Sequence, residues 1–266
     1  MKPNEDYLNI NKSNWNSRVD THYNSDFYDI NSFRIGETSL NEIELGLLGD
    51  VTAKKIAHLQ CHFGLDSLSL TRMGAKVTGL DFSDKAINTA KQLNSDLGLD
   101  ARFVCADVYR ANEFLPNDFD IVFTTYGTIG WLPNINKWAE TIKNLLKAGG
   151  KLIFVEFHPV LWMFDDNFNE ISYSYFNRED IITSSIETYT DGEVISQPKT
   201  VSWNHSLGEV MQALKSQGLQ IEDFNEYDYS PYDCFANTTK ISEKKYQIKG
   251  MEGKLPMVYS VVASRS

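Results

Sequence analysis

Two aspartates follow consecutive apolar segments in the first half of the chain, and their spacing suits the recognition of a nucleoside. Asp81 comes directly after the segment KVTGL, and Asp107 comes just after the segment ARFVC. Asp81 also lies about 20 residues beyond the loop 60–65, a separation at which an acidic side chain can hold both hydroxyls of a ribose. Asp107 and its neighbour Val108 are then placed to meet an adenine ring. These residues predict a site for an adenosine-containing ligand.

That site requires the apolar segments to be strands of one parallel sheet. From residue 54 onward, short apolar segments alternate with helical ones, and this alternation predicts a parallel sheet with right-handed crossovers. Ligands of such a sheet bind outside the carboxyl ends of its strands. The predicted strands are 55–60, 76–80, 101–105, 119–124 and 151–157, and the predicted helices between them are 67–73, 84–97 and 138–146.

Ser83 and several glycines mark where the predicted helices begin and end. Ser83 is expected to cap the helix 84–97, which Gly98 closes, and the pair Gly149-Gly150 is expected to stop the helix 138–146. Towards the end of the chain, a helix over 206–217 precedes strands over 220–229 and 257–264.

Two further parts do not follow the alternation. Residues 1–50 contain two expected helices, 14–23 and 39–48, the second with Ser39 as N-cap and Glu42 as its capping-box partner. Residues 158–204 are rich in Tyr, Thr, Ile and Phe between Asn, Asp and Gly turns, so we expect an inserted antiparallel patch. The chain is therefore predicted as an N-terminal helical segment (1–50) and one α/β domain (51–266) that carries an insertion (158–204).

Composition limits the partners. The 266 residues include 25 Lys and Arg against 36 Asp and Glu, a net charge of −11, and no basic run is present. Nucleic acid is therefore an unexpected partner, because phosphate binding needs a basic face. The three cysteines are widely spread, no apolar run approaches a membrane span, and the first 20 residues lack the apolar core of a signal peptide. We expect a cytoplasmic protein, monomeric or homodimeric, without a membrane partner.

The loop 60–65 does not suit a dinucleotide. The fingerprint G-x-G-x-x-G would require glycines at Gln60, His62 and Leu65, and none is present. Bulky side chains also hinder the approach of a pyrophosphate to the backbone. An NAD(P)-dependent oxidoreductase stays only an alternative.

The stretch HLQCHFGLDSLSLTRMGAKVTGLDFS (58–83) resembles motifs I and II of the class I S-adenosylmethionine-dependent methyltransferases, in a branch whose first motif reads L-Q-C-x-x-G. The resemblance continues through CADVY (105–109), FDIVFTTYGTIGWL (119–132) and LLKAGGKLIFVEFHP (145–159), and more loosely through WNHSLGEVMQAL (203–214). It implies a Rossmann-like, seven-stranded sheet, mostly parallel with an antiparallel last strand and with helices on both faces. It also implies S-adenosylmethionine as methyl donor and S-adenosylhomocysteine as product.

The chain departs from the usual first motif of this family, D-x-G-x-G-x-G. His58 stands where that motif begins with an acid, and only Gly64 remains of its three glycines. The methionine half of the donor carries no phosphate, so it does not need the full set, and the Gln60 amide can meet its carboxylate or amino group. The resemblance implies donor contacts from Gln60, Cys61, His62, Gly64, Asp81, Phe82, Ser83, Asp107, Val108 and Tyr126.

Catalytic residues are harder to predict, because methyl transfer needs mainly alignment and sometimes a base. Glu156 and His158, at the end of the fifth strand, are the candidates for that base, with His205 as a further histidine. His58, Cys61 and His62 do not make a zinc site, because alternate strand residues face opposite ways and no fourth ligand lies nearby. We expect no metal.

The aromatic residues outside the sheet suggest a cover for the site. Trp131, Trp162, Tyr173, Tyr175 and Trp203 cluster around the insertion in sequence, either as a small satellite core or as an apolar acceptor pocket.

Trp15, Arg18 and Tyr28 in the N-terminal segment are expected to reach the donor, with Arg18 offering a fork to its carboxylate. The N-terminal segment and the insertion would then close as a lid, and the insertion would form part of the acceptor pocket. The leading hypothesis is transfer of a methyl group to an unidentified small molecule; a non-catalytic S-adenosylmethionine-binding protein is the other alternative.

Overall fold

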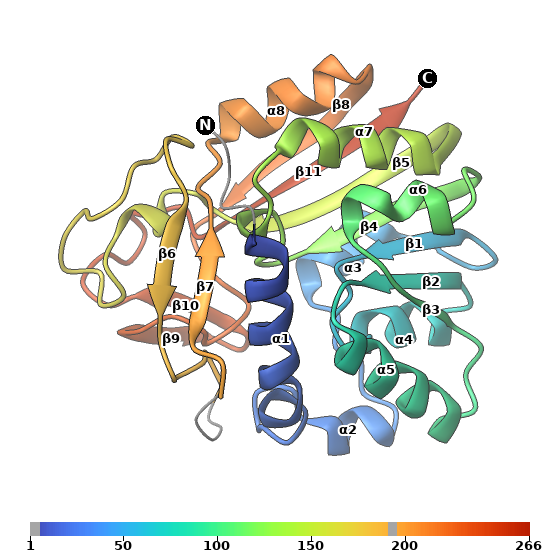
Figure 1. The fold of residues 1–266 in the computed structure, drawn as a ribbon, viewed down its shortest axis with the longest axis horizontal. Helices are drawn as coiled ribbons and strands as arrows, with labels where there is room; N and C mark the ends of the chain where they lie inside the picture. The colour runs from blue at the N-terminus through green and yellow to red at the C-terminus, as the bar shows by residue number, and fades with distance from the viewer. Residues whose placement is uncertain (1–5, 191–195) are drawn as a thin grey trace.

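A seven-stranded sheet forms the centre of the protein in a computed structural model that describes residues 6–190 and 196–266 (Figure 1). The strand order is β3-β2-β1-β4-β5-β11-β8, and β11 runs antiparallel to both of its neighbours. The predicted, mostly parallel sheet with an antiparallel last strand is confirmed. Its strands are β1 (Lys55–Leu59), β2 (Lys76–Asp81), β3 (Arg102–Cys105), β4 (Phe119–Thr125), β5 (Leu146–Phe157), β8 (Leu219–Tyr227) and β11 (Val258–Arg265).

Helices cover both faces of the sheet, and each face has its own apolar core. Alternate strand residues face opposite ways, so Ile56 of β1 packs into one core while Ala57 and Leu59 pack into the other. The first core lies under α3 (Glu42–Leu48), α4 (Leu65–Arg72) and α5 (Asp84–Asp96), and the second lies under α6 (Ala111–Phe114), α7 (Ile135–Leu145) and α8 (Leu207–Ser216). No helix among residues 6–190 and 196–266 is long and apolar enough to cross a membrane.

Some predicted boundaries were wrong, each for a local reason. Helix α3 begins two residues later than its predicted cap would place it, because Asn41 is the N-cap and its backbone N–H donates to Glu44 at 3.1 Å. The pair Gly149-Gly150 lies within β5 rather than ending a helix, and Gly149 has a φ of 73° where the register between β4 and β5 shifts. Ser83 does cap α5, since its side chain accepts from the N–H of Ala86.

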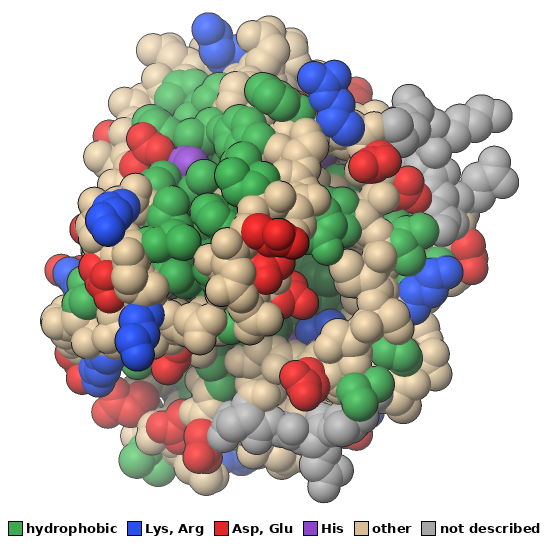
Figure 2. Space-filling model, turned by 90° about the vertical axis from the view of Figure 1, so that its left-hand side faces the viewer, with side chains coloured by type: hydrophobic (Ala, Val, Ile, Leu, Met, Phe, Trp, Pro, Cys, Tyr) green, Lys and Arg blue, Asp and Glu red, His purple; other side chains and the backbone are tan. Residues whose placement is uncertain are grey.

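Two small antiparallel sheets lie beside the main sheet, at the left of Figure 1. The pair β6 (Ile181–Ser184) and β7 (Lys199–Ser202) is the predicted inserted patch. The pair β9 (Thr238–Ser242) and β10 (Lys245–Ile248) was not predicted, because its turn lacks the usual glycine and Lys244 adopts the left-handed conformation instead. Figure 2 looks onto this end of the molecule, where hydrophobic side chains gather in one broad group.

Helix α1 (Tyr7–Tyr23) runs between the main sheet and the β6–β7 pair (Figure 1). It begins seven residues before its predicted start. The Asn11 side chain donates to the carbonyl of Val201 at 2.7 Å and accepts from the N–H of the same residue at 2.9 Å. Asn14 donates to the carbonyl of Gln197 at 2.5 Å. Polar side chains therefore tie the N-terminal helix to the insertion, about 190 residues away in sequence.

Candidate functional site

A pocket lies where the carboxyl ends of β1, β2, β3 and β4 meet α1. Its volume is about 390 Å³ including the part open to solvent. Gln60, Phe82, Asp107 and Val108, all expected from the sequence to contact the donor, line this pocket. The other lining residues are Tyr7, Leu8, Asn11, Leu80, Ala106, Trp131 and Leu132.

Sequence reasoning missed the three pocket residues that α1 contributes. Tyr7, Leu8 and Asn11 lie on the first turns of that helix, before its predicted start. The spacing of Asn11, Trp15, Arg18 and His22 in steps of three and four residues was the available signal, since such residues share one helix face.

The loop after β1 keeps a glycine-like backbone without the glycines. Gln60, His62 and Gly64 have φ values of 55°, 50° and 83°, all in the left-handed region. A non-glycine residue in that region costs about 1–2 kcal/mol. At Gly64 a Cβ would come within 2.6 Å of the Phe103 ring, so this glycine is required. The loop thus adopts a strained turn and in return presents two polar side chains.

Gln60 has one satisfied and one unsatisfied end. Its side-chain nitrogen donates to the carbonyl of Thr128 at 2.8 Å, which fixes the orientation of the amide. Its Oε1 atom is buried and has no hydrogen-bond partner among the described residues. Such orphaned acceptors are rare in folded proteins. Gln60 therefore offers an acceptor to a ligand that carries an N–H or O–H group.

Asp81 holds the loop after β1 against the end of β2. Its carboxylate accepts from the backbone N–H of His62 at 2.9 Å and from that of Ser83 at 2.8 Å. Burial raises the pKa of Asp81 to about 6. Ser83 is turned away from the pocket and donates to the Asn16 side chain at 2.6 Å.

Cys61 does not face the pocket. Its side chain is buried in the core, and its sulfur would lie 2.9 Å from a Cβ placed at Gly79. Burial raises the pKa of this thiol well above its usual value. The left-handed turns on either side of Cys61 point the thiol inward, so the expected donor contact at this residue stays a prediction for its backbone. Only its backbone can reach a ligand.

Arg18 is a buried cation without a counter-ion. Its side chain is 9% exposed, and its guanidinium donates to the Asn14 side chain at 2.7 Å and to the Thr188 hydroxyl at 3.0 Å. Across residues 6–190 and 196–266, no ion pair joins it to a carboxylate. The guanidinium also lies 5.4 Å from the Trp15 ring. A buried unpaired charge is costly, so Arg18 is poised for an anionic ligand.

Residues 58–154 match the protein family described as "Methyltransferase domain". That span runs from the end of β1 through β2, β3 and β4 to most of β5, and it includes the loops after these strands that line the pocket. This part of the chain is therefore a methyltransferase domain that uses S-adenosylmethionine. S-adenosylmethionine is therefore its methyl donor, and the match gives no support to an NAD(P)-dependent oxidoreductase.

Two known proteins are similar to this chain over more than half of its length. A Coxiella burnetii protein named ubiquinone biosynthesis O-methyltransferase is 27% identical over 182 residues, 66% of this chain and 72% of that protein. A Haemophilus influenzae protein is 28% identical over 155 residues, 54% of this chain, and the match spans 61% of that protein's length.

The fold is similar to that of solved S-adenosylmethionine-dependent methyltransferases. The Mesorhizobium loti structure has a TM-score of 0.57 and 20% identity, covering 84% of this chain and 96% of that one. The Clostridium acetobutylicum structure has a TM-score of 0.57 and 16% identity, covering 92% and 94%.

In this methyltransferase Glu156 organises the loop after β4. Its side chain is 2% exposed and accepts hydrogen bonds from the backbone N–H groups of residues 127, 128, 129 and 157 and from the Thr128 hydroxyl. Burial raises its pKa, and the backbone hydrogen bonds oppose that rise. Both carboxylate oxygens are engaged, so the expectation of Glu156 as a base was wrong and its role is structural.

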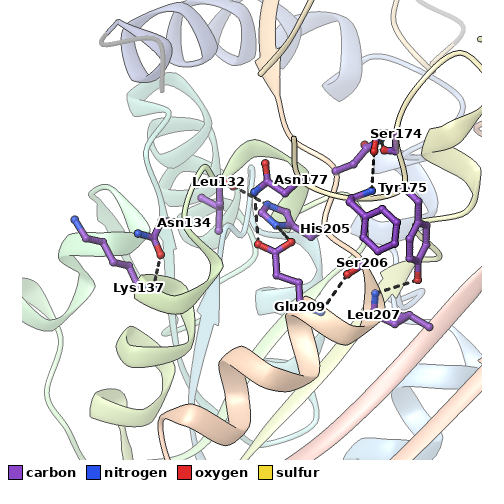
Figure 3. A network of polar contacts seen from close by, with 12 residues as sticks. Leu132, Asn134, Lys137, Ser174, Tyr175, Asn177, His205, Ser206, Leu207 and Glu209 are labelled. Atoms are coloured by element: carbon purple, nitrogen blue, oxygen red, sulfur yellow. Dashed lines mark hydrogen bonds and ion pairs between the residues drawn. The ribbon is translucent and has the colours of Figure 1, made fainter. Parts of the chain in front are cut away.

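His158 is engaged on both ring nitrogens, whereas Nδ1 of His205 only lies close to a carboxylate, without a hydrogen bond. His158 contacts Glu226 through Nε2 at 2.9 Å and accepts from the N–H of Val160 at 3.2 Å. Both ring nitrogens of His158 are thus used by partners within the protein, so this geometry gives no support to a catalytic His158. His205 joins the carbonyl of Leu132 at 2.8 Å to Glu209 of α8 at 3.2 Å (Figure 3). His205 therefore anchors a wall of the pocket to α8.

Figure 3 also shows how the insertion is attached to that helix. The hydroxyl of Tyr175 accepts from the N–H of Leu207 at 3.2 Å (Figure 3). Within the insertion, the carbonyl of Ser174 accepts from the Asn204 side chain at 2.7 Å. Tyr175 thus has an anchoring role at the N-terminus of α8.

The predicted aromatic cluster separates into two groups. Beside the pocket, the ring centroids of Trp131 and Trp15 are 5.4 Å apart, and those of Trp203 and Tyr7 are 5.2 Å apart. Trp162 instead packs against Phe235, with their ring centroids 5.7 Å apart.

Tyr28 and Tyr126, both expected to contact the donor, form hydrogen bonds to other parts of the protein. Tyr126, with a φ of 45°, donates to Glu44 at 2.9 Å and so points away from the pocket residues. Tyr28 is paired with Tyr189 of the insertion at 2.5 Å between their hydroxyls. Burial raises the pKa of Tyr28 and Tyr126 well above its usual value, so both phenols stay neutral.

We expect Glu156→Gln to destabilise the fold. An amide nitrogen in place of one oxygen faces backbone N–H groups and leaves buried donors unsatisfied, which costs about 2–3 kcal/mol. Urea unfolding of the two proteins measures this loss. If the variant is as stable as the wild type but cannot transfer methyl groups, the result would instead support the hypothesis that Glu156 is the base.

Acid should destabilise the protein through its buried histidines. Burial, the neighbouring histidine and Arg18 lower the pKa of His22 to about 2, and burial and Arg18 lower that of His62 to about 3. Between pH 6.5 and about 3 the unfolded chain binds protons at these rings and the folded chain does not. Stability is therefore lost as pH falls, by up to about 1.4 kcal/mol per pH unit for each ring.

The variant His62→Gln should show a shallower fall of the unfolding free energy between pH 6.5 and 5, measured in urea. Asp81 acts in the opposite sense, because its raised pKa costs stability as pH rises from about 4 to about 6. That contribution is common to both proteins. Equal slopes in the two proteins would mean that His62 titrates normally when folded.

Proposed function

We propose that this methyltransferase transfers the methyl group of S-adenosylmethionine to a small acceptor held between the strand ends, α1 and the insertion. The observation that carries the proposal is the pairing of Arg18, a buried cation without a counter-ion, with Gln60, a buried acceptor without a donor. The methionine end of the donor carries one carboxylate and one ammonium group. Arg18 suits the first and Gln60 suits the second.

The adenosine end fits the pocket lined by Asp107, Val108 and Phe82. Asp81 is assigned to the ribose, since it ends β2 beside that pocket. Asn11 lines the pocket and Arg18 lies seven residues further along α1, which corresponds to about 10 Å along a helix. One face of α1 therefore runs from the nucleoside part of the site to its amino-acid part.

The donor supplies a methyl group already activated by a positively charged sulfur. The chain's own part is to align the acceptor, exclude water and accept a proton where the acceptor has one to lose. Trp15 and Trp131 shield the region between the pocket and Arg18, with ring centroids 5.4 Å apart.

A small acceptor is favoured over a nucleic acid. The net charge of −11 leaves no basic face for a phosphate backbone. The relatives named ubiquinone biosynthesis O-methyltransferase support a small molecule and oxygen as the methylated atom. Aromatic rings around the strand ends, including Tyr28, Tyr126 and Tyr189, suit an acceptor with a flat apolar part. A cytoplasmic monomer or homodimer without nucleic-acid or membrane partners is part of this proposal.

The N-terminal segment (1–50) and the insertion (158–204) act together as a lid over the domain 51–266. Support comes from the hydrogen bonds of Asn11 and Asn14 to the β7 side of the insertion. A helix attached through polar side chains can separate into water at a lower cost than one attached through an apolar face.

The variant Arg18→Gln should distinguish binding of the amino-acid end of the donor from binding of its adenosine end. We expect S-adenosylhomocysteine to bind about 10- to 150-fold more weakly, the range for a lost hydrogen bond to a charged group. Methylthioadenosine, which lacks the amino-acid end, should bind unchanged in calorimetry. Asp81→Ala should weaken both ligands by about 1.5–3 kcal/mol, and Arg34→Gln, an exposed arginine paired with Asp96, is the matched control.

Equal weakening of both ligands by Arg18→Gln would show a general loss of fold rather than a lost carboxylate contact. Binding of NADH with no response to S-adenosylhomocysteine would overturn the proposed function altogether.

Donor binding should slow amide hydrogen exchange in α1 and β7 together. With S-adenosylhomocysteine at 100 times its Kd, opening that releases the ligand is suppressed by up to about 100-fold. The β9–β10 pair, which lies outside the proposed lid, should exchange as before. Protection of the main sheet without protection of α1 would contradict the lid.

A further inference from the structure

Two histidines from distant parts of the chain meet beside the proposed donor site. His22 on α1 and His62 in the loop after β1 are 3.1 Å apart between Nδ1 and Nε2. His22 is 0% exposed, and its Nε2 lies 2.8 Å from the Thr188 hydroxyl. The Nδ1 atom of His62 is buried and has no hydrogen-bond partner among the described residues. This ring nitrogen is therefore free for a ligand.

The surrounding hydroxyls favour one arrangement of the protons. Tyr28 and Tyr189 share a hydrogen bond of 2.5 Å, and the Tyr189 hydroxyl also lies 3.5 Å from Nδ1 of His22. We take the Tyr189 hydroxyl to be hydrogen-bonded to Tyr28, which leaves the single lone pair on Nδ1 of His22 to His62, whose Nε2 is closer at 3.1 Å. Neutral His22 then carries its proton on Nε2 and donates it to Thr188, whose oxygen has two lone pairs and also accepts from Arg18.

The same arrangement fixes the proton of His62. Because Nδ1 of His22 accepts, Nε2 of His62 must donate to it, and a neutral His62 then has a bare lone pair on Nδ1. The ring is held by its contacts with Trp15 at 5.3 Å and Phe63 at 4.2 Å. A fixed imidazole with one free lone pair has the form of a general base.

We propose that His62 is the catalytic base of this methyltransferase, that His22 positions it, and that the acceptor is therefore a hydroxyl compound that loses its proton on methylation. This rests on the proposed function and reassigns His62 from donor contact to the acceptor. The acceptor oxygen forms a bond to the methyl carbon, the carbon–sulfur bond breaks with its electron pair on sulfur, and the hydroxyl proton moves to Nδ1 of His62. The imidazolium then returns its proton to water when the products leave.

The charged and titratable groups around the pair explain when this base acts. They are Arg18 on α1, the neutral phenols of Tyr28 and Tyr189, and Asp81 at the end of β2, whose carboxylate accepts from the backbone N–H of His62. With Arg18 unpaired, its charge opposes protonation of both rings. A donor carboxylate beside Arg18 cancels that charge, so the basicity of His62 rises when the donor is in place.

Nuclear magnetic resonance of the full chain with ¹⁵N-labelled histidine tests the arrangement without any acceptor. With saturating S-adenosylhomocysteine at pH 7, we expect His62 to be neutral with its proton on Nε2 and Nδ1 bare. The resonance is assigned by its loss in His62→Gln. A proton on Nδ1 of His62 in this complex would overturn the proposal.

Catechol, with benzylamine as the amine control, tests the chemistry. His62→Gln keeps an amide near the Nε2 position for His22 but has no base, so we expect S-adenosylhomocysteine to bind within about fivefold of wild type. Its kcat for catechol methylation should fall by about 100-fold or more and rise with pH as phenolate forms. Added imidazole should restore part of the rate.

His22→Gln should leave the KM for catechol unchanged, lower kcat and shift its pH profile, as expected of a positioning residue. A wild-type kcat and pH profile in His62→Gln, or methylation of benzylamine but not catechol, would overturn the proposal. Failure of the wild-type chain to bind S-adenosylhomocysteine would instead be a failure of the proposed function.

Discussion

The buried carboxylate of Glu156 is the constraint on which the rest of the site depends. It lies in β5, opposite Tyr259 of β11, and gathers the backbone N–H groups of the loop that follows β4. A carboxylate this deep is tolerable only because those donors replace water. The loop so fixed presents the carbonyl of Thr128 to Gln60, which leaves the other end of that amide free. The polar character of the site thus begins with a residue that does not touch a ligand.

Helix α1 completes the site from the opposite side, and it does so with polar side chains. Its buried residues are Asn11, Asn14, Arg18, Val19 and His22, so the usual apolar stripe is absent. The asparagines are satisfied by the backbone of the insertion, while Arg18 finds only neutral partners. A helix that docks in this way depends on its partners being present. If the proposed lid opens, its movement and ligand binding would therefore be coupled through the unpaired guanidinium of Arg18.

The charge distribution separates the proposed roles. Arg18 is the only cation next to the histidine pair among the described residues, and the phenols around it are neutral. The carboxylate of the donor would pair with that cation, and the part of the lowering of both histidine pKa values that comes from Arg18 would then be smaller. Binding of the donor would thus prepare His62 for the acceptor through electrostatics, without a large movement of the sheet.

The sequence by itself determined the sheet, its ligand edge and most of the nucleoside pocket, because apolar periodicity and strand-end acids act over short distances along the chain. Asp81, Asp107 and Gln60 were found in this way. Only the tertiary structure decided which histidine is free. His158 and Glu156 have suitable chemistry in sequence, yet their atoms are used by Glu226 and by backbone N–H groups. His22 and His62 are 40 residues apart and meet because α1 crosses the strand ends, a contact between distant segments that no local pattern encodes.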